Sequence, residues 1–289
     1  MRGIHQESGI NSVINISKVP DRGIMVSDLS KFMDTVREKT PLVHHITNYV
    51  TVNDCANICI CSGGSPVMTD ADADVVDMSR IASAVVLNMG TLNPRTVDAM
   101  LLAGNVAKKN NVPVIFDAVG AGATEYRNKV AEDIINKVRP DVIKGNCGEI
   151  SFLAGVIGGV RGVDSTSTAD NIGDLVLGLA KKYECMVVAT GKTDYVSDGK
   201  SLYVLSNGSD YQGLVSGTGC MLSSVLGSYV GANGVSLCAL IAAITAFNVA
   251  AEKAESDCKG PGSFKVALLD QLYNLKSDEM ASKAKVQKV

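Results

Sequence analysis

The sequence predicts an α/β fold in which helices cover both faces of a mostly parallel sheet. Short apolar segments alternate with segments of helical periodicity along most of the chain. Two of the apolar segments, residues 84–87 and 186–189, contain no polar side chain, which is typical of strands that are covered on both faces. No linker, change of composition or internal repeat divides residues 25–289, so we expect a single domain there.

The amino-terminal part is expected to begin with an extension. Residues 1–24 show no sustained period, which indicates a loosely attached segment. Apolar side chains at helical spacing follow over residues 27–36, and a short strand is expected at 42–43. Asn53 can then cap a helix that ends at Gly63.

Strands and helices alternate after this point. We expect a strand at 67–68 and a helix at 72–78 before the apolar strand 84–87. A long helix is predicted for residues 94–109, because proline is favoured in the first turn of a helix. The segment 114–116 is the next buried strand.

The middle of the chain continues the alternation. Thr124 is placed to cap a helix that ends at Val138, and a strand is expected at 142–143. A helix over residues 146–153 leads into a glycine-rich loop at 155–162, and another helix is expected at 169–181.

The carboxyl-terminal part is predicted to add a hairpin and three helices. After the strand 186–189, the segments 195–196 and 202–205 flank an Asp-Gly pair that favours an antiparallel hairpin. The three closing helices are expected at 219–229, 236–255 and 261–275. In such a sheet, ligands bind beyond the carboxyl ends of the parallel strands.

Composition favours a small-molecule enzyme of the cytoplasm. Lys and Arg number 27 against 30 Asp and Glu, and aromatic residues make up 4% with no Trp, so neither charge nor stacking favours nucleic acid. The eight cysteines form no C-x-x-C pair, and only three histidines are present, so we do not expect a zinc site. Cysteines scattered through apolar segments indicate a protein of a reducing compartment. The most apolar stretch, 237–251, is shorter than the roughly 20 residues of a membrane span, so we expect no membrane partner.

The segment VSGTGC (215–220) precedes an apolar helix. Its glycines allow backbone N–H groups to converge on an anion, and the helix dipole adds partial positive charge there. The expected anion hole consists of Gly217, Thr218, Gly219 and Cys220. The same dipole favours a thiolate at Cys220. The alternative interpretation is a flexible loop followed by a small buried residue.

Two carboxylates stand near the ends of predicted strands. Asp117 precedes a glycine-rich turn, where it can hold a hydrated Mg²⁺ that faces phosphates or can simply bond its own turn. Glu149 either reaches the same metal or forms a capping box with Asn146. Lys144, at the end of the preceding strand, is placed to contact a phosphate.

Three further features are weak by themselves. Thr190 ends a strand and is followed by glycine, with Asp194 four residues beyond it, a pattern that is more often only a turn. The pair His44 and His45 offers a general base but no partner, so we expect a structural role. Met68 would ordinarily fill the core.

Eight blocks in a fixed order carry a resemblance to a known family. The sequence resembles the hydroxyethylthiazole kinase family, within the ribokinase-like superfamily, from about residue 26 to residue 276. The blocks are PLVHHITNYVTVND (41–54), GGSPVM (63–68), VLNMGTL (86–92), FDAVGAGAT (116–124), KGNCGEI (144–150), ATGKTD (189–194), VSGTGCMLSS (215–224) and KGPGSF (259–264). The resemblance implies a ribokinase-like three-layer sandwich.

The resemblance also implies an activity. It implies transfer of the γ-phosphoryl group of ATP to the hydroxyl of 4-methyl-5-(2-hydroxyethyl)thiazole, a thiamine precursor, with Mg²⁺ and with active sites at the subunit interfaces of a homotrimer. The residues that match family positions are Cys220 for catalysis, Met68 and Gly217 for the thiazole, Lys144 and Thr190 for ATP, and Asp117 and Glu149 for Mg²⁺. A cysteine at position 220 is usual for thiazole kinases, whereas most ribokinase-like relatives carry aspartate there.

The sequence departs from the family pattern at three of these blocks. Lys144 stands where relatives commonly carry arginine, which keeps the charge but removes a bidentate contact. Ala118 stands where proline is usual and Gly64 where alanine is usual, and neither change removes a functional group.

Three other functions compete with this interpretation. A hydroxymethylpyrimidine kinase shares the glycine-rich cradle, but Cys220 and the blocks 41–54 and 63–68 favour the thiazole. A cysteine hydrolase would use Cys220 as its nucleophile and would need a base, for which only His44 and His45 are available outside the extension. The third alternative is a nucleotide sensor without catalysis.

Overall fold

The chain builds one sheet in the order β2-β1-β3-β4-β5-β6-β7-β8-β9, seen in a computed structural model that describes residues 28–156 and 172–289. Its strands are β1 (Leu42–Ile46), β2 (Ser65–Met68), β3 (Ala84–Asn88), β4 (Val114–Asp117), β5 (Val142–Asn146), β6 (Met186–Thr190), β7 (Asp194–Ser197), β8 (Leu202–Leu205) and β9 (Val286–Lys288). The first six strands run parallel, and the last three join antiparallel. The mostly parallel sheet is confirmed.

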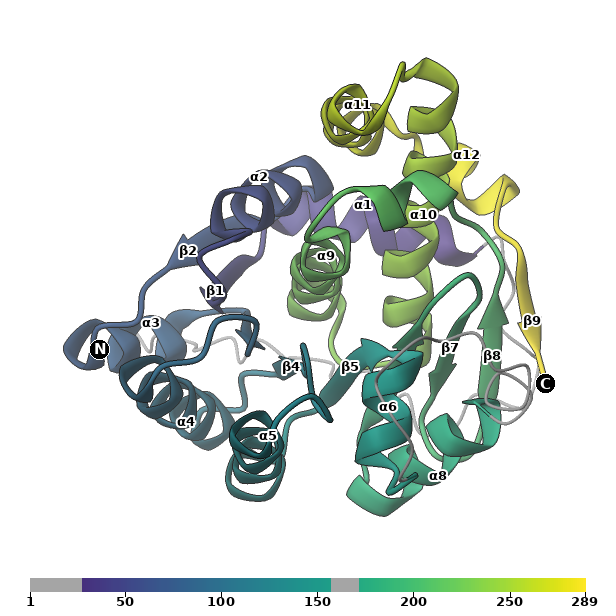
Figure 1. Ribbon diagram of the computed structural model, residues 1–289. Helices are drawn as coiled ribbons and strands as arrows, with labels where there is room; N and C mark the ends of the chain where they lie inside the picture. Colours follow the sequence, from purple (N-terminus) through teal and green to yellow (C-terminus); the bar gives the residue numbers. More distant parts are fainter. Residues whose placement is uncertain (1–27, 157–171) are drawn as a thin grey trace, which may run out of the picture.

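Helices cover both faces of this sheet and complete three layers (Figure 1). One face carries α1 (Leu29–Lys39), α2 (Val52–Ser62), α9 (Thr218–Asn233), α10 (Leu237–Asp257), α11 (Pro261–Asn274) and α12 (Ser277–Ser282). The other face carries α3 (Asp72–Ile81), α4 (Pro94–Lys109), α5 (Glu125–Val138), α6 (Cys147–Leu153) and α8 (Ile172–Tyr183). Each face has its own apolar core, so the predicted three-layer sandwich is confirmed.

Local signals explain the helices whose ends were predicted correctly. Helix α4 begins at Pro94 behind a capping box, in which the Asn93 side chain accepts from the Thr96 N–H and the Thr96 hydroxyl accepts from the Asn93 N–H. Thr124 caps α5 by accepting a hydrogen bond from the Arg127 N–H. These caps depend only on neighbouring residues, so they can be read from the sequence.

Several predicted boundaries differ from the structure by two or more residues, and two of them concern the site. Helix α2 begins at Val52, so Asn53 lies inside its first turn and its side chain accepts from Asn57 Nδ2 rather than capping the helix. Strand β5 continues past the predicted 142–143 as far as Asn146, which places Lys144 inside the strand. The polar residues of β5 are held by pairing with β6, and the sequence pattern alone does not show this pairing.

The end of the chain contains more than the three predicted helices. The short helix α12 and the strand β9 follow α11, and β9 pairs antiparallel with β8 to form one edge of the sheet. Strand β2, which contains Pro66, forms the other edge. The predicted extension 1–24 and most of the predicted loop 155–162 lie outside the described residues.

Helix α10 is the one helix in the described part of the chain that is long and apolar enough to cross a membrane. Most of its apolar window is buried inside the molecule, where it packs against α9 and α11. The helix is 21 residues long, so the expectation that this stretch is too short for a membrane span is wrong, and it is the burial of α10 that is typical of a core helix.

The two adjacent histidines of β1 are buried in the sheet. His44 Nε2 lies 3.0 Å from the Thr69 carbonyl oxygen and its Nδ1 lies 3.1 Å from Ser79 Oγ, while His45 Nδ1 lies 3.0 Å from the Val43 carbonyl oxygen. Burial lowers the pKa of both rings, that of His45 to about 4. Both histidines are therefore neutral structural residues.

The buried state of His45 predicts that stability decreases as the pH falls over a defined range. The pKa of His45 is 6.5 when unfolded and about 4 when folded, so below pH 6.5 protons bind the unfolded chain first. By pH 5 this linkage costs about 2 kcal/mol of unfolding free energy, at roughly 1.4 kcal/mol per pH unit. Urea unfolding of the wild type and of His45→Gln at pH 8 and pH 5 tests this. The free energy of unfolding of the wild type minus that of His45→Gln is expected to be smaller at pH 5 than at pH 8 by about 2 kcal/mol. An equal difference at both pH values would contradict the linkage to His45.

Candidate active site

The carboxyl ends of β4 and β5 meet the start of α9 around one buried ion pair. Asp117 ends β4 and is fully buried, and Lys144 Nζ lies 3.1 Å from its Oδ1 atom. The same ammonium group donates to the carbonyl oxygen of Gly219 at 2.9 Å. Strand ends and helix start are thus joined through one charged group.

Hydrogen bonds extend from Asp117 to Cys220. Asp117 Oδ2 accepts from Ser223 Oγ at 2.7 Å and from Asn88 Nδ2 at 2.8 Å. Asn88 Oδ1 in turn accepts from Asn48 Nδ2, which also lies 3.4 Å from the Cys220 sulfur. The amides of Asn88 and Asn48 therefore connect the buried carboxylate with the thiol at the helix start.

The electrostatics of the site keep Lys144 charged. Burial by itself would lower the pKa of Lys144, but nearby negative charges, first among them that of Asp117, raise it above its ordinary value. Removing one partner of such a buried pair leaves an uncompensated charge, which is strongly destabilising. The site therefore holds a fixed positive charge beneath the start of α9.

Glu149 forms the capping box that the sequence allows and also contacts the turn after β4. Its backbone N–H donates to Asn146 Oδ1 and its Oε2 accepts from the Asn146 N–H, so the capping box is present. Its Oε1 accepts from the Gly120 N–H at 2.7 Å. Burial raises the pKa of Glu149, with the charge of Asp117 adding to the effect, so the two carboxylates face the same region.

These carboxylates suit Mg²⁺ and not a metal that needs a protein cage. In the described residues no three His, Cys, Asp or Glu side chains gather as a metal site. Mg²⁺ prefers oxygen ligands, keeps several waters and takes one or two carboxylates together with substrate phosphates. Asp117 and Glu149 supply such a donor set.

The start of α9 has the open first turn that the predicted anion cradle requires. Gly217 stands at the N-cap position with φ +88°, and within the described residues no side chain caps the first turn. The N–H groups of Thr218, Gly219 and Cys220 belong to that turn, where a helix has no backbone partners of its own. A Cβ at position 217 would collide with the Thr51 side chain, so glycine is required both by conformation and by space.

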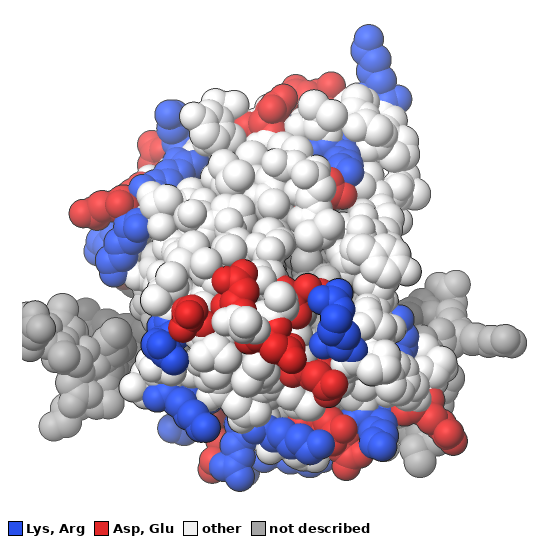
Figure 2. Space-filling view, turned by 90° about the vertical axis from the view of Figure 1, so that its left-hand side faces the viewer, with Lys and Arg blue, Asp and Glu red and all other residues white. Residues whose placement is uncertain are grey.

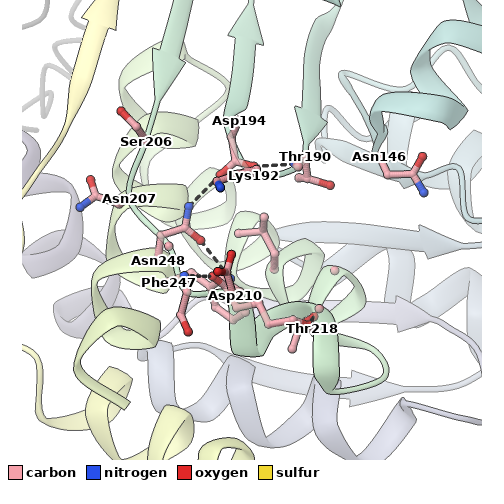
Figure 3. Close-up of a pocket in the computed structure, with 17 residues that line it drawn as sticks. Asn146, Thr190, Lys192, Asp194, Ser206, Asn207, Asp210, Thr218, Phe247 and Asn248 are labelled. Atoms are coloured by element: carbon pink, nitrogen blue, oxygen red, sulfur yellow. Dashed lines mark hydrogen bonds between the residues drawn. The ribbon is translucent and has the colours of Figure 1, made fainter. Parts of the chain in front are cut away.

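A cavity of about 480 Å³ opens beside this cradle (Figure 3). It lies between the ends of β5 and β6, the segment 206–213 and helix α10. Thr218 and Gly219 line the side formed by the start of α9, and Thr190 lines the side formed by β6. Its lining is Asn146, Thr190, Gly191, Lys192, Asp194, Ser206, Asn207, Gly208, Ser209, Asp210, Gln212, Gly213, Thr218, Gly219, Leu222, Phe247 and Asn248.

The structure brings most of the predicted site residues together. Asp117, Lys144 and Cys220 share one hydrogen-bonded network, and Glu149 faces it. Lys144 does not line the cavity, because its ammonium group points to Asp117 and the Gly219 carbonyl. Met68 stands apart from the cavity, at the partly exposed end of β2 beside His45.

Three functional residues were not singled out from the sequence. Asn48 and Asn88 follow or end buried strands, and Ser223 lies one turn into α9. A polar side chain at the carboxyl end of an apolar strand was the available signal for Asn88. No local pattern indicates that Ser223 reaches Asp117, which is 106 residues away in the chain.

The sequence model of the hydroxyethylthiazole kinase family matches residues 33–278. The chain belongs to this family. It is 49% identical to the hydroxyethylthiazole kinase of Methanocella arvoryzae, over 89% of this chain and 97% of that protein. It is 48% identical to the enzyme of the same name from Methanocorpusculum labreanum, again over 89% of this chain and 97% of the relative.

Solved structures agree with this membership. The hydroxyethylthiazole kinase structure from Pyrococcus horikoshii is 38% identical, with a TM-score of 0.84 over 91% of this chain and 99% of that one. A pyridoxal kinase from Staphylococcus aureus, at 16% identity and TM-score 0.56 over 73% of this chain and 87% of that one, shares the ribokinase-like fold alone. The chain is therefore an ATP-dependent kinase, and neither the hydrolase nor the pyrimidine kinase alternative is favoured.

Gly217 provides a direct test of the cradle. Gly217→Ala places a side chain at positive φ against Thr51, and we expect it to lower the free energy of unfolding by about 1–2 kcal/mol and to reduce kcat/KM. Gly178→Ala, at an exposed helical position with open space, is the control and is expected to be neutral or slightly stabilising. When it is combined with Gly217→Ala, Thr51→Ser removes the methyl group with which the new Cβ collides, and it is expected to restore part of the lost stability and activity. Equal behaviour of both alanine variants in urea unfolding and kinetics would refute the role of Gly217.

Proposed function

We propose that the start of α9 is where the γ-phosphoryl group of ATP passes to the hydroxyl of 4-methyl-5-(2-hydroxyethyl)thiazole. The observation that carries this proposal is the uncapped first turn of α9, with Cys220 on it, between the cavity and the Asp117–Lys144 pair. Phosphoryl transfer needs positioned charge around the phosphate oxygens more than covalent chemistry from the protein. The geometry offers that arrangement.

ATP is proposed to occupy the cavity. Its phosphates would lie beside the start of α9, where the N–H groups of Thr218, Gly219 and Cys220 can receive the oxygens of the transferred group. Thr190 lines the same cavity. Lys144 would act through its fixed charge under the cradle, since its ammonium group already bonds the Gly219 carbonyl.

Asp117 and Glu149 would hold Mg²⁺, which when bound neutralises charge on the β- and γ-phosphates. The two carboxylates are kept in place by different elements. Ser223 and Asn88 fix Asp117, and the N–H groups of Gly120 and Asn146 fix Glu149. Asp117 Oδ2 is filled by its two bonds, whereas Asp117 Oδ1, which accepts from Lys144, and the two oxygens of Glu149 each accept one bond and retain a lone pair for a further ligand.

The acceptor alcohol is proposed to lie between the Cys220 sulfur and the phosphoryl group that the cradle holds. Asn48 Nδ2 donates toward the Cys220 sulfur and orients it, so the sulfur is the proposed acceptor for the proton of the hydroxyl as the oxygen attacks phosphorus. Gly217 and Met68 are the proposed contacts of the thiazole ring. Neither histidine of β1 serves as the base that a hydrolase would need, because each is buried and bonded within its own surroundings.

We also propose a cytoplasmic homotrimer with active sites between subunits. The face that includes α2 and the edge strand β2 has a wide area without charged side chains, bordered by acidic and basic groups (Figure 2). Ile60 on α2 is 54% exposed, and Val266 and Tyr273 on the adjoining α11 are exposed as well. Met68 ends β2, so a subunit packed on this edge would complete the thiazole site. All eight cysteines are free thiols, as a reducing compartment requires.

Cys220 is the residue whose replacement tests the proposed reaction. Cys220→Ala is expected to lower kcat by about 10- to 10⁴-fold, the range for loss of general-base assistance, with little change in ATP binding. Cys220→Asp is expected to stay active because it supplies another acceptor of similar volume. The assay follows ADP formation with Mg·ATP and the thiazole alcohol.

The matched control is Cys258→Ala, which removes a thiol at the end of α10 and is expected to leave kcat unchanged. A thiol-alkylating agent is expected to inactivate the wild type, and saturating thiazole alcohol to protect it. Full activity of Cys220→Ala would exclude Cys220 from the chemistry.

The metal role is tested by the two carboxylates separately. Asp117→Asn and Glu149→Gln are each expected to raise the Mg²⁺ concentration needed for half-maximal activity, because each removes negative charge from the proposed ligand set. Glu149→Gln can accept from only one of the Asn146 and Gly120 N–H groups, whereas Asp117→Asn leaves the buried Lys144 ammonium without its counter-charge, so the effect of Glu149→Gln on stability is expected to be the smaller of the two. An unchanged Mg²⁺ dependence in both variants would leave the carboxylates with structural roles only.

A further inference from the structure

A chain of four hydrogen bonds crosses the wall of the cavity away from the cradle. The Gly191 N–H donates to Asp194 Oδ1 at 3.0 Å, and Asn248 Nδ2 donates to Asp194 Oδ2 at 2.7 Å. Gln212 Nε2 then donates to Asn248 Oδ1 at 3.1 Å, and the Ser209 N–H donates to Gln212 Oε1 at 2.9 Å. Figure 3 shows the side chains of Asp194 and Asn248 joined at this cavity, which Gln212 also lines.

The chain of bonds joins elements that are far apart in the sequence. Asp194 begins β7, Asn248 lies in the middle of α10, and Gln212 belongs to the 3-10 helix η3 (Asp210–Leu214). Asp194 and Asn248 are almost fully buried. The turn after β6 and the segment 206–214 therefore keep a fixed spacing across the cavity through these side chains.

The two ends of this series of hydrogen bonds determine what kind of group must occupy a position between them. Both ends are backbone N–H groups, of Gly191 and Ser209, and these can only donate. An amide in the chain accepts on one side and donates on the other, so amides alone would leave two donors facing each other at one link. One member must accept on both sides, and the Asp194 carboxylate is that member.

Keeping the Asp194 carboxylate ionised at this buried position is energetically unfavourable. Burial raises the pKa of Asp194 to about 6, although the Gly191 N–H, the Asn248 amide and the charge of Lys144 act in the opposite direction. A neutral amide would avoid this cost but would break the order of donors and acceptors. The requirement for a double acceptor explains why a buried ionised group occupies the position.

We propose that Asp194 is a positioning residue for the nucleotide, which through Asn248 and Gln212 holds the two walls of the cavity at the spacing that ATP requires. Asp194 contacts neither the cradle nor Cys220 through any bond of this chain, so its effect is on nucleotide affinity and not on the transfer step. The inference rests on the proposed location of ATP in this cavity.

An exchange of the two side chains tests the proposal. Asp194→Asn leaves two donors opposed, and Asn248→Asp leaves two acceptors opposed, so each single variant is expected to raise the Kd for ADP and the KM for ATP about tenfold or more. In the double variant Asp194→Asn/Asn248→Asp, the amide introduced on β7 donates to the carboxylate introduced on α10, and every link again has one donor and one acceptor. We expect the double variant to return to within about threefold of the wild type, since its charge and volume are also unchanged.

The measurements separate positioning from stability and from the proposed reaction. ADP binding by calorimetry needs no thiazole, while kcat and both KM values come from the kinase assay, and thermal unfolding shows that each variant is folded. Asp98→Asn makes the same chemical change at an exposed position of α4, outside the cavity and outside the chain of bonds, and is expected to alter Kd less than threefold.

The outcomes are distinct. Single variants that bind ADP like the wild type, or a double variant as weak as the single ones, would overturn the role of Asp194. A fall in kcat with unchanged nucleotide affinity would overturn it as well. A wild type that binds ADP but does not phosphorylate the thiazole alcohol would refute the proposed function alone, while the binding series would still decide the positioning role. A wild type that binds no nucleotide would refute both.

Discussion

The buried ion pair between Lys144 and Asp117 is the constraint on which the rest of the site depends. Two charges removed from water remain stable only when their other hydrogen-bonding positions are filled. Asn88 and Ser223 do this for the carboxylate, and the Gly219 carbonyl does it for the ammonium group. The consequence is geometric, because a single network fixes the ends of β3, β4 and β5 against the first turn of α9. Because no side chain in the described part of the chain caps the first turn of α9, its N–H groups are open to an anion, and the bonds from Lys144 and to Asp117 hold the helix start in place instead.

The elements that were predicted well are those whose signals are local. The ends of α4 and α5 follow from Pro94, Thr124 and their caps, and the alternation of buried strands placed the site at the carboxyl edge of the sheet. The two carboxylates and the glycine cradle could also be found, since each lies next to a strand or helix end. The resemblance to a family supplied the chemistry that such positions alone left open.

What the sequence did not reveal depends on contacts between distant segments. The added polar length of β5, the α2 start at Val52 and the final strand β9 are set by pairing and packing, so no pattern of one segment predicts them. The same holds for the side chains between elements. Asn248 looks like an interruption in an apolar helix, and its purpose is evident only when Asp194 and Gln212 are seen on either side.

The two edges of the sheet have a consequence for solubility at high concentration. An open edge with free N–H and carbonyl groups can recruit a strand from another molecule and start a fibril. Pro66 has no N–H to offer in β2, and β9 is only three residues long and carries Lys288. Neither edge is a good template for a further strand, so a nine-stranded sheet can be kept in solution without extending from molecule to molecule. A partner at the β2 edge is then contacted through side chains. Side-chain contacts can distinguish one partner from another, whereas backbone hydrogen bonds between strands do not.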